Sequence, residues 1–278
     1  MNKREILKTI AAQAEQGELK FSTNAEVALR VCRALDDPNC HIDVAARLVQ
    51  AEPLLAARVV AIANSVAYNR AGREISDVHT AVSRLGFRTV RALATAVVTR
   101  QMSGSAALPE HQALAAQLWE HTAHVAALAH VIARRVTRQD PETALFAGII
   151  HEVGGFYLLS RCKEFPGLLD GDPSTWVEQG ESEIGRAVLK VLSVPVPVFE
   201  AIEVLWQGYL AMPPETLGDT LILADWLAPV ESPLHQLGDN ATEGMRASID
   251  LVVGQETLAE ILRESAEEVE SLTGALRF

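Results

Sequence analysis

Apolar residues recur at intervals of three and four along almost all of this 278-residue chain. One example is the stripe formed by Val27, Val31 and Leu35. Such spacing is typical of helices that bury one face, whereas half-buried strands alternate with a period of two. Period-two alternation is rare here, and aromatic residues, which favour strands, make up only 5% of the chain. We therefore expect an all-α fold built as a multi-helix bundle.

One stretch interrupts the helical pattern strongly enough to suggest a boundary. Residues 102–110 (MSGSAALPE) are small and contain a proline. We expect an N-terminal helical subdomain over 1–101, a linker at 102–110, a helical core over 111–232 and a C-terminal tail over 233–278. Because the linker is short, the two halves should pack together. The tail should end in one acidic amphipathic helix, around 256–272, that packs on the body or on another subunit.

Charge and cysteine content narrow the functional class. The net charge is −12, and the residues after 104 hold 26 acidic against 10 basic residues. Such a surface repels nucleic acid and anionic membranes. We find no apolar run of the roughly 18 residues that a membrane span needs, and no secretory leader. The three cysteines form no CxxC pair, so we expect a cytoplasmic protein without a disulfide framework.

Four ionisable residues lie in apolar surroundings where burial is costly. His151 and Glu152 are adjacent in ALFAGIIHEVGGFYLL, Asp225 lies in LILADWLA, and His121 lies in LWEHTAHVAALAH. A buried charge needs a partner. The four side chains could converge on one divalent cation, since imidazole and carboxylate suit Mn²⁺, Fe²⁺ or Mg²⁺. They could equally form a buried hydrogen-bonded network that fixes the register of the helices.

The other histidines carry weaker signals. His124 and His130 follow His121 by three and nine residues, and we expect them to border a packed face. His235 lies in a proline-bearing loop, and the sequence predicts nothing specific for it.

Two distant blocks, in the right order, resemble the HDOD domain, a bacterial signalling domain related to the HD metal-dependent phosphohydrolases. In the front half the blocks are AEPLLAARVVAIANS and SRLGFRTVRAL. In the back half, GIIHEVGGFYLL is similar to the family's LLHDIGxLxL, and LWEHTAHVAALAHVIA and LILADWLA resemble the flanking histidine and aspartate helices. The resemblance covers about residues 20–230 and implies an HD-like core over 111–232. It also implies that His121, His151, Glu152 and Asp225 form a vestigial metal site.

The departures from the family pattern point away from catalysis. Glu152 stands where the family usually has aspartate, and Glu181 stands where a further histidine would fall. Leu205 and Trp206 replace a His-His pair, and an apolar pair cannot bind metal. Trp206 could also fill the place of a substrate. A two-metal phosphohydrolase is therefore not expected.

The resemblance implies a non-catalytic cytoplasmic signal-transduction or regulatory module that acts through protein partners, with no catalytic residues. Two alternatives remain. One is a mononuclear metal-dependent phosphohydrolase acting on a nucleotide or phosphoester. The other is a nucleic-acid-associated regulator that would use an arginine edge formed by Arg84, Arg88 and Arg91, although nucleic acid is an unlikely partner for so acidic a chain. The oligomeric state and the identity of the partner are left open.

Overall fold

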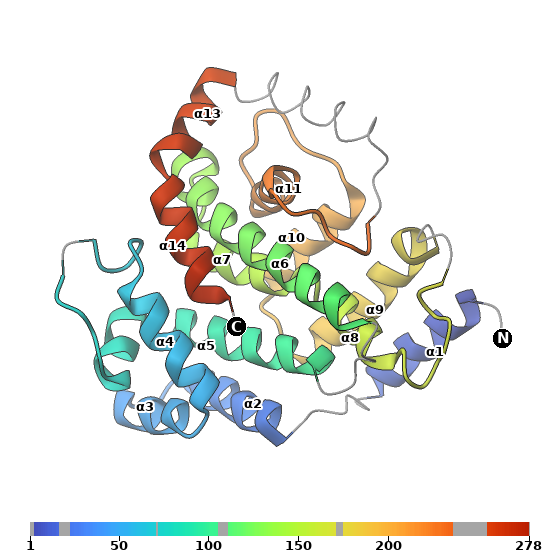
Figure 1. Ribbon diagram of the computed structural model, residues 1–278, viewed down its shortest axis with the longest axis horizontal. Coiled ribbons are helices and arrows are strands. Elements are labelled where there is room, and N and C mark those ends of the chain that lie inside the picture. Colours follow the sequence, from blue (N-terminus) through green and yellow to red (C-terminus); the bar gives the residue numbers. More distant parts are fainter. Residues whose placement is uncertain are drawn as a thin grey trace.

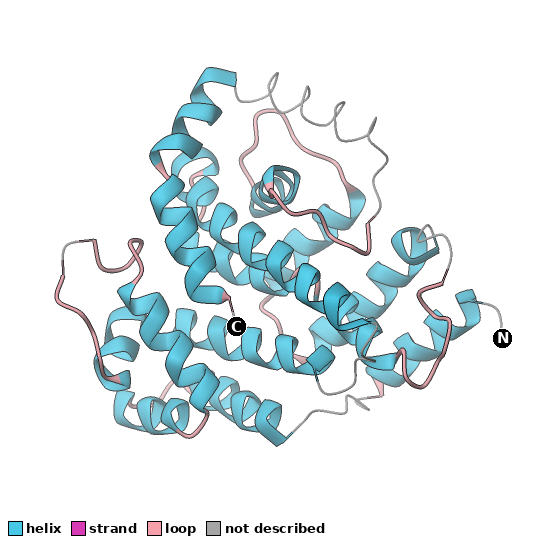
Figure 2. Ribbon diagram, viewed as in Figure 1, coloured by secondary structure: helices cyan, strands magenta, loops and turns pink. Residues whose placement is uncertain are grey.

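The computed structural model describes residues 3–16, 23–70, 72–104, 111–170, 175–235 and 255–277. Within these ranges every regular element is a helix, so the all-α prediction is confirmed (Figure 2). The helices are α1 (Lys3–Glu15), α2 (Thr23–Leu35), α3 (Ile42–Gln50), α4 (Pro53–Asn64), α5 (Val78–Gly104), α6 (Gln112–Ile132), α7 (Pro141–Ile150), α8 (Val153–Arg161), α9 (Glu181–Val191), α10 (Val196–Gln207), α11 (Leu217–Leu227), α13 (Gln255–Glu264) and α14 (Ala266–Leu276). Two π-helical turns, η2 (Ala133–Thr137) and η3 (Trp176–Gly180), extend α6 and precede α9.

Helices α2, α3 and α4 pack around α5 and form the lower left part of the molecule in Figure 1. Helix α4 begins at Pro53, and the side chain of Glu52 caps it by accepting a hydrogen bond from the amide of Leu55. Gly86 breaks the helical path of α5, with φ 75° and ψ 166°. This left-handed backbone is one that glycine adopts at little cost. The helix continues to Gly104, so the first three residues of the expected linker are helical, and 105–110 lie outside the described residues.

The back half is built on the pair α6 and α7, which α11 also contacts. The two helices approach so closely at Gly148 that a Cβ atom there would lie 2.5 Å from Cα of Ala126. A methyl group at that position would overlap the backbone of α6. Close approach of the backbones thus fixes how α7 crosses α6, and with it the placement of His151 at the end of α7 relative to His121 on α6.

Helix α1 crosses to the opposite half of the chain, and α14 contacts both halves (Figure 1). Helix α1 packs on α9, with Leu7 against Gly180 and the side chain of Gln13 accepting a hydrogen bond from Arg161. Helix α14 packs on α6 and α4. The acidic tail therefore packs on the body. The single helix expected around 256–272 is wrong in detail, because α13 and α14 are separate helices that meet at Ser265.

Residues Pro141–Arg161, which form α7 and α8, have the length and mean hydropathy of a membrane span. This segment is an exception to the expectation that no run reaches that length. It is 89% buried inside the fold, because it forms the centre of the core.

Candidate metal centre

The four predicted site residues come together where the middle of α6 meets the C-terminal ends of α7 and α11. Nε2 of His121 lies 3.2 Å from Nε2 of His151 and 3.2 Å from Oδ1 of Asp225. Ligand atoms of His121, His151 and Glu152 all lie within 4.8 Å of one another. The convergence that spacing alone could not establish is therefore present in the fold.

Both histidines are oriented by backbone carbonyl groups. Nδ1 of His121 lies 2.8 Å from the carbonyl oxygen of Val230, and Nδ1 of His151 lies 2.7 Å from that of Gly148. A carbonyl oxygen only accepts, so each Nδ1 carries a proton and donates it. This arrangement directs both Nε2 atoms toward each other and toward Asp225. Histidine ligands of metal ions are commonly held in this way.

The carboxylate of Glu152 is the strongest indication that the site suits a cation. The residue is 1% exposed and lies in the turn between α7 and α8. Neither of its carboxylate oxygens has a hydrogen-bond partner among the described residues. The ring of His235, 4.0 Å from Oε1, only partly balances this carboxylate, and a buried carboxylate without hydrogen bonds is destabilising. A cation at the site would remove this cost.

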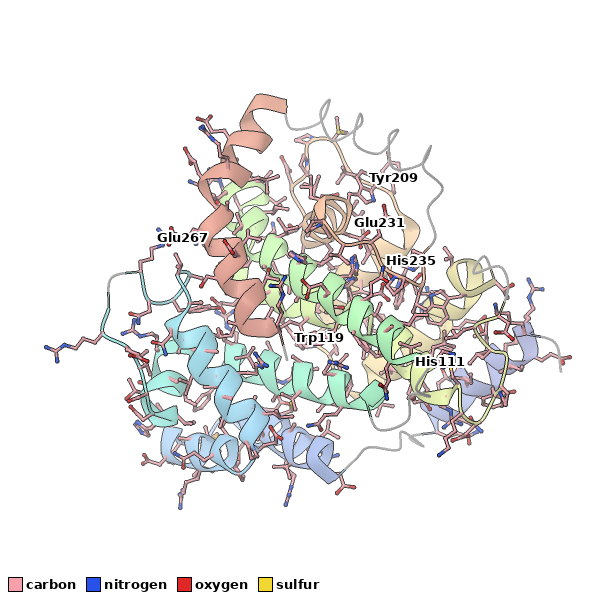
Figure 3. The ribbon with its side chains drawn as sticks, viewed as in Figure 1. His111, Trp119, Tyr209, Glu231, His235 and Glu267 are labelled. Carbon is pink, nitrogen blue, oxygen red and sulfur yellow. The ribbon has the colours of Figure 1, made fainter. Side chains whose placement is uncertain are left out.

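A segment that the sequence analysis did not single out covers the site. We call residues 228–235, which follow α11, the strap. Val230 in the strap accepts the hydrogen bond from His121, and Leu234 packs against Gly155 beside Glu152. His235 lies at the end of the strap, and Figure 3 labels it beside Glu231 of the same segment.

His235 adds a positive group between two carboxylates. Its Nε2 lies 3.0 Å from Oε2 of Glu181, and its Nδ1 lies 4.0 Å from Oε1 of Glu152. Burial alone would lower the pKa of His235, but the hydrogen bond to Glu181 and the two negative charges outweigh burial and raise it to about 10. His235 is therefore charged at neutral pH and partly balances these carboxylates.

The remaining pKa shifts follow from burial and mutual charge. Burial lowers the pKa of His151, and the positive charge of His121 lowers it further. For His121 burial also favours the neutral form, but the hydrogen bond and charge of Asp225 outweigh it and raise the pKa. For Asp225 burial favours the protonated acid, yet His121 outweighs it and lowers the pKa. Asp225 thus favours the charged form of His121, whereas burial favours the neutral form of His151.

The structure also places Glu181 and Trp206, two of the residues that depart from the pattern of a two-metal site. Glu181 starts α9 and bonds to His235, so it belongs to the edge of the site. Trp206 packs against the backbone of Gly185, one turn along α9, where a Cβ atom would lie 2.4 Å from its ring. Its ring also lies 5.4 Å from the guanidinium of Arg186. Trp206 therefore covers α9 beside the site.

A second buried polar cluster lies farther along α6, around His130. Nδ1 of His130 lies 3.4 Å from Glu268 of α14, and Nε2 lies 3.8 Å from Glu142 of α7. Tyr68 donates a hydrogen bond to the same Glu142, and Arg134 and Arg70 both reach Glu268. His130 thus joins three parts of the chain. The sequence analysis had assigned it only to the border of a packed face.

The arginine edge proposed for nucleic acid is already paired within the protein. Arg84 donates to the carbonyl oxygen of Tyr68, Arg88 lies 3.2 Å from Asp140, and Arg91 lies 2.7 Å from Asp36. The three side chains therefore reach different partners.

The residues at the site fit a divalent ion. The ligands are two Nε2 atoms, the carboxylate of Asp225 and the carboxylate of Glu152, which has no hydrogen bond among the described residues. Such ions prefer nitrogen and oxygen ligands of this kind. The identity of a metal at this site stays a prediction.

Known proteins share this architecture over its whole length. A protein named as a candidate metal-dependent phosphohydrolase from Shewanella amazonensis SB2B is 21% identical, covers 99% of both chains and has a TM-score of 0.71. An HDOD domain protein of unknown function from Geobacter sulfurreducens is 23% identical, covers 98% of this chain and 97% of its own, and has a TM-score of 0.64. No curated protein matches the chain. At this level of identity the likeness concerns the fold. The model of the HDOD domain matches residues 22–170, more than half of the sequence, and the chain belongs to the HDOD domain family.

Proposed function

We propose that this chain is a non-catalytic, cytoplasmic regulatory module of signal transduction that acts through protein partners and holds at most one divalent ion in its HD-type site. His121, His151, Glu152 and Asp225 would hold the ion. A bound ion would supply positive charge to the two carboxylates and so tie α6, α7 and α11 together.

The observation that carries this proposal is the closure of the site. His121, His151 and Glu152 are each no more than 4% exposed. The strap lies over them, with Val230 bonded to His121 and Leu234 packed beside Glu152. A phosphoester must reach the ion directly to be hydrolysed. The strap therefore covers three of the four ligands, whereas the side chain of Asp225 is 23% exposed.

A mononuclear phosphohydrolase is the second candidate function, and the convergence of the four ligands favours it. In that case the ion would act as a Lewis acid and activate a water molecule. Substrate could enter only if the strap moved away, since His235 is bonded to Glu181 at the edge of the site. The two candidates therefore differ in whether the closed site ever admits a substrate.

Metal content and phosphoester turnover, measured on the same preparation, test the proposal. The protein would be incubated with Mn²⁺, Fe²⁺ or Mg²⁺, analysed for bound metal and assayed with nucleotide and model phosphoester substrates. We expect no more than one ion per chain, lost in Asp225→Asn, and no turnover. The matched control for metal content is Asp43→Asn. The side chain of Asp43 is 76% exposed.

Turnover would overturn the proposal if it required metal and disappeared in His151→Ala. The control for that loss is His79→Ala, which removes a half-exposed imidazole far from the site. Binding of two ions per chain would also contradict the proposal, because it would require a second set of ligands.

A further inference from the structure

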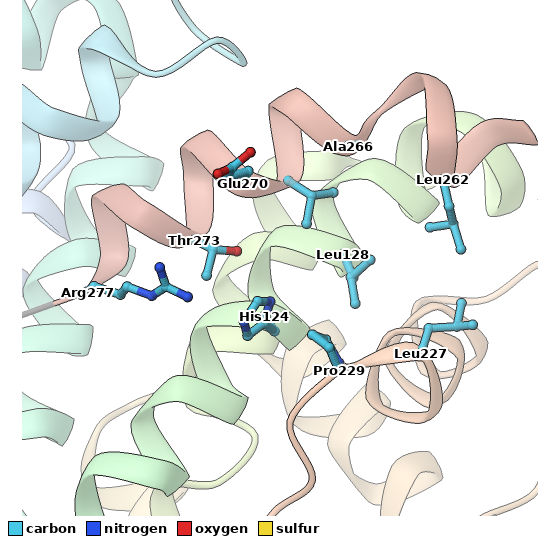
Figure 4. A pocket seen from close by; sticks show the side chains of 10 residues that line it. His124, Leu128, Leu227, Pro229, Leu262, Ala266, Glu270, Thr273 and Arg277 are labelled. Carbon is cyan, nitrogen blue, oxygen red and sulfur yellow. The ribbon is translucent and has the colours of Figure 1, made fainter. Parts of the chain in front are cut away.

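A cavity separate from the metal centre lies between α6, the end of α11 and the last two helices. Its volume is about 480 Å³, within the range of small-molecule sites. Figure 4 shows Leu128 and Leu227 on one side of it and Leu262 on another. Val269 and Pro229 complete the apolar wall. The body of any ligand here must therefore be largely hydrocarbon.

One polar atom in the wall has no partner. Thr273 of α14 is 1% exposed, and its hydroxyl forms no hydrogen bond among the described residues. Threonine in a helix commonly donates to a carbonyl group one turn earlier, and Thr273 does not. The hydroxyl is directed toward the side of the cavity occupied by Leu128 (Figure 4). A buried hydroxyl of this kind favours a ligand that brings one hydrogen-bonding group.

The charged groups at the rim leave no free positive charge for an anion. Nε of Arg277 lies 3.0 Å from both carboxylate oxygens of Glu120. The same carboxylate lies 3.2 Å from Nε2 of His124, and burial lowers the pKa of that ring. Glu270, also in the lining, adds a negative charge. The rim therefore disfavours an anionic head group.

We propose that this cavity binds a neutral, mainly apolar small molecule with a single hydroxyl or comparable polar group, which bonds to Thr273. Leu227 and Pro229 in its wall flank the start of the strap, next to Val230, which holds His121. A ligand there would contact both the C-terminal helix and the segment that closes the metal centre. The proposal does not depend on whether the centre holds an ion.

Three probes with the same eight-carbon chain test the proposal: 1-octanol, octanoate and octylammonium. Binding to the full chain would be followed by calorimetry and by NMR. We expect saturable one-to-one binding of 1-octanol and weaker binding of both charged probes. Contacts detected between octanol protons and the methyl groups of Leu128, Leu262 and Val269 would place the probe in the cavity without any substitution.

Two variants sharpen the test. Thr273→Val keeps the shape of the side chain and removes the hydroxyl, so it should weaken octanol binding about tenfold. Ala266→Phe should fill the cavity and abolish binding, whereas Glu267→Phe, the matched control on the exposed face of the same helix, should not.

Four results would overturn the proposal. They are absence of saturable octanol binding, tighter binding of either charged probe, equal binding by Thr273→Val, and octanol contacts located elsewhere. The NMR contacts in the wild-type chain decide the matter even if Ala266→Phe fails to fold.

Discussion

The imidazole of His130 lies 3.4 Å from the carboxylate of Glu268, and this contact joins the C-terminal end of α6 to α14. Arg134 and Arg70 reach the same carboxylate from two other segments. Glu268 is 4% exposed, so its charge depends on these partners rather than on water. The cluster attaches the C-terminal helix to both halves of the molecule.

Glu268→Ala should lower the free energy of unfolding by about 3 kcal/mol, because it leaves the buried ring of His130 without one of its two carboxylate partners. The matched control is Glu267→Ala, at the exposed neighbouring position (Figure 3), where we expect a change within about 0.5 kcal/mol. Denaturant unfolding at neutral pH measures both. Equal effects of the two substitutions would show that the cluster does not stabilise the fold.

The carboxylate of Glu268 also predicts that part of the free energy of unfolding is lost in acid. Burial would raise the pKa of Glu268, but hydrogen bonds from His130 and Arg134 outweigh it and lower the pKa to about 2. A folded-state pKa below the unfolded value, about 4.3, stabilises the protein above that value, and the stabilisation is lost as pH falls toward 2. The difference in unfolding free energy between wild type and Glu268→Gln should therefore shrink by about 2 kcal/mol between pH 5 and pH 3. A difference that stayed constant would contradict the assigned shift.

Removing part of the strap should open the metal centre. Leu234 is 5% exposed and packs against Gly155, beside the carboxylate of Glu152. In a metal-loaded sample, Leu234→Ala should release the ion to a chelator several-fold faster than wild type, because water gains access to the ligands. Leu54→Ala, on the exposed side of α4, serves as control. Equal release rates would mean that the strap does not limit access.

Two glycine substitutions should have opposite effects. A methyl group at Gly148 would overlap Cα of Ala126, so Gly148→Ala should destabilise the protein by about 3 kcal/mol. Gly274 is exposed in α14 with no atom near its Cβ position, and Gly274→Ala should stabilise the protein by about 0.5–1 kcal/mol. Thermal or denaturant unfolding of both variants checks the pair. A neutral Gly148→Ala would show that α6 and α7 can move apart.

Periodicity was sufficient to predict the all-α fold, because a helix carries its apolar pattern within a dozen local residues. The apolar surroundings also marked the four candidate ligands, since an ionisable group inside a long apolar run must face a partner, but their role as metal ligands stays a prediction. Asp225 is an example: its surroundings, LILADWLA, are apolar on every side. Local patterns of this kind need no knowledge of the tertiary arrangement.

The contribution of His235 could not be predicted, because the strap has no periodic pattern and its contacts join distant segments. His235 meets Glu181, 54 positions earlier. One signal was present: Glu152 and Glu181 are two acids near one site, and they require a compensating cation. The contact between His130 and Glu268 could not be predicted either, because 138 positions of the sequence separate the two residues.

Helices α1 and α14 both contact distant parts of the chain, and these contacts have a consequence for the order in which the protein can fold. Leu7 meets Gly180, and Arg70 meets Glu268, 198 positions later. Contacts that close such long loops form late and slow the reaction, because the chain loses much entropy before they are made. During synthesis the contacts of α4 and α6 with α14 can form only after α14 has emerged.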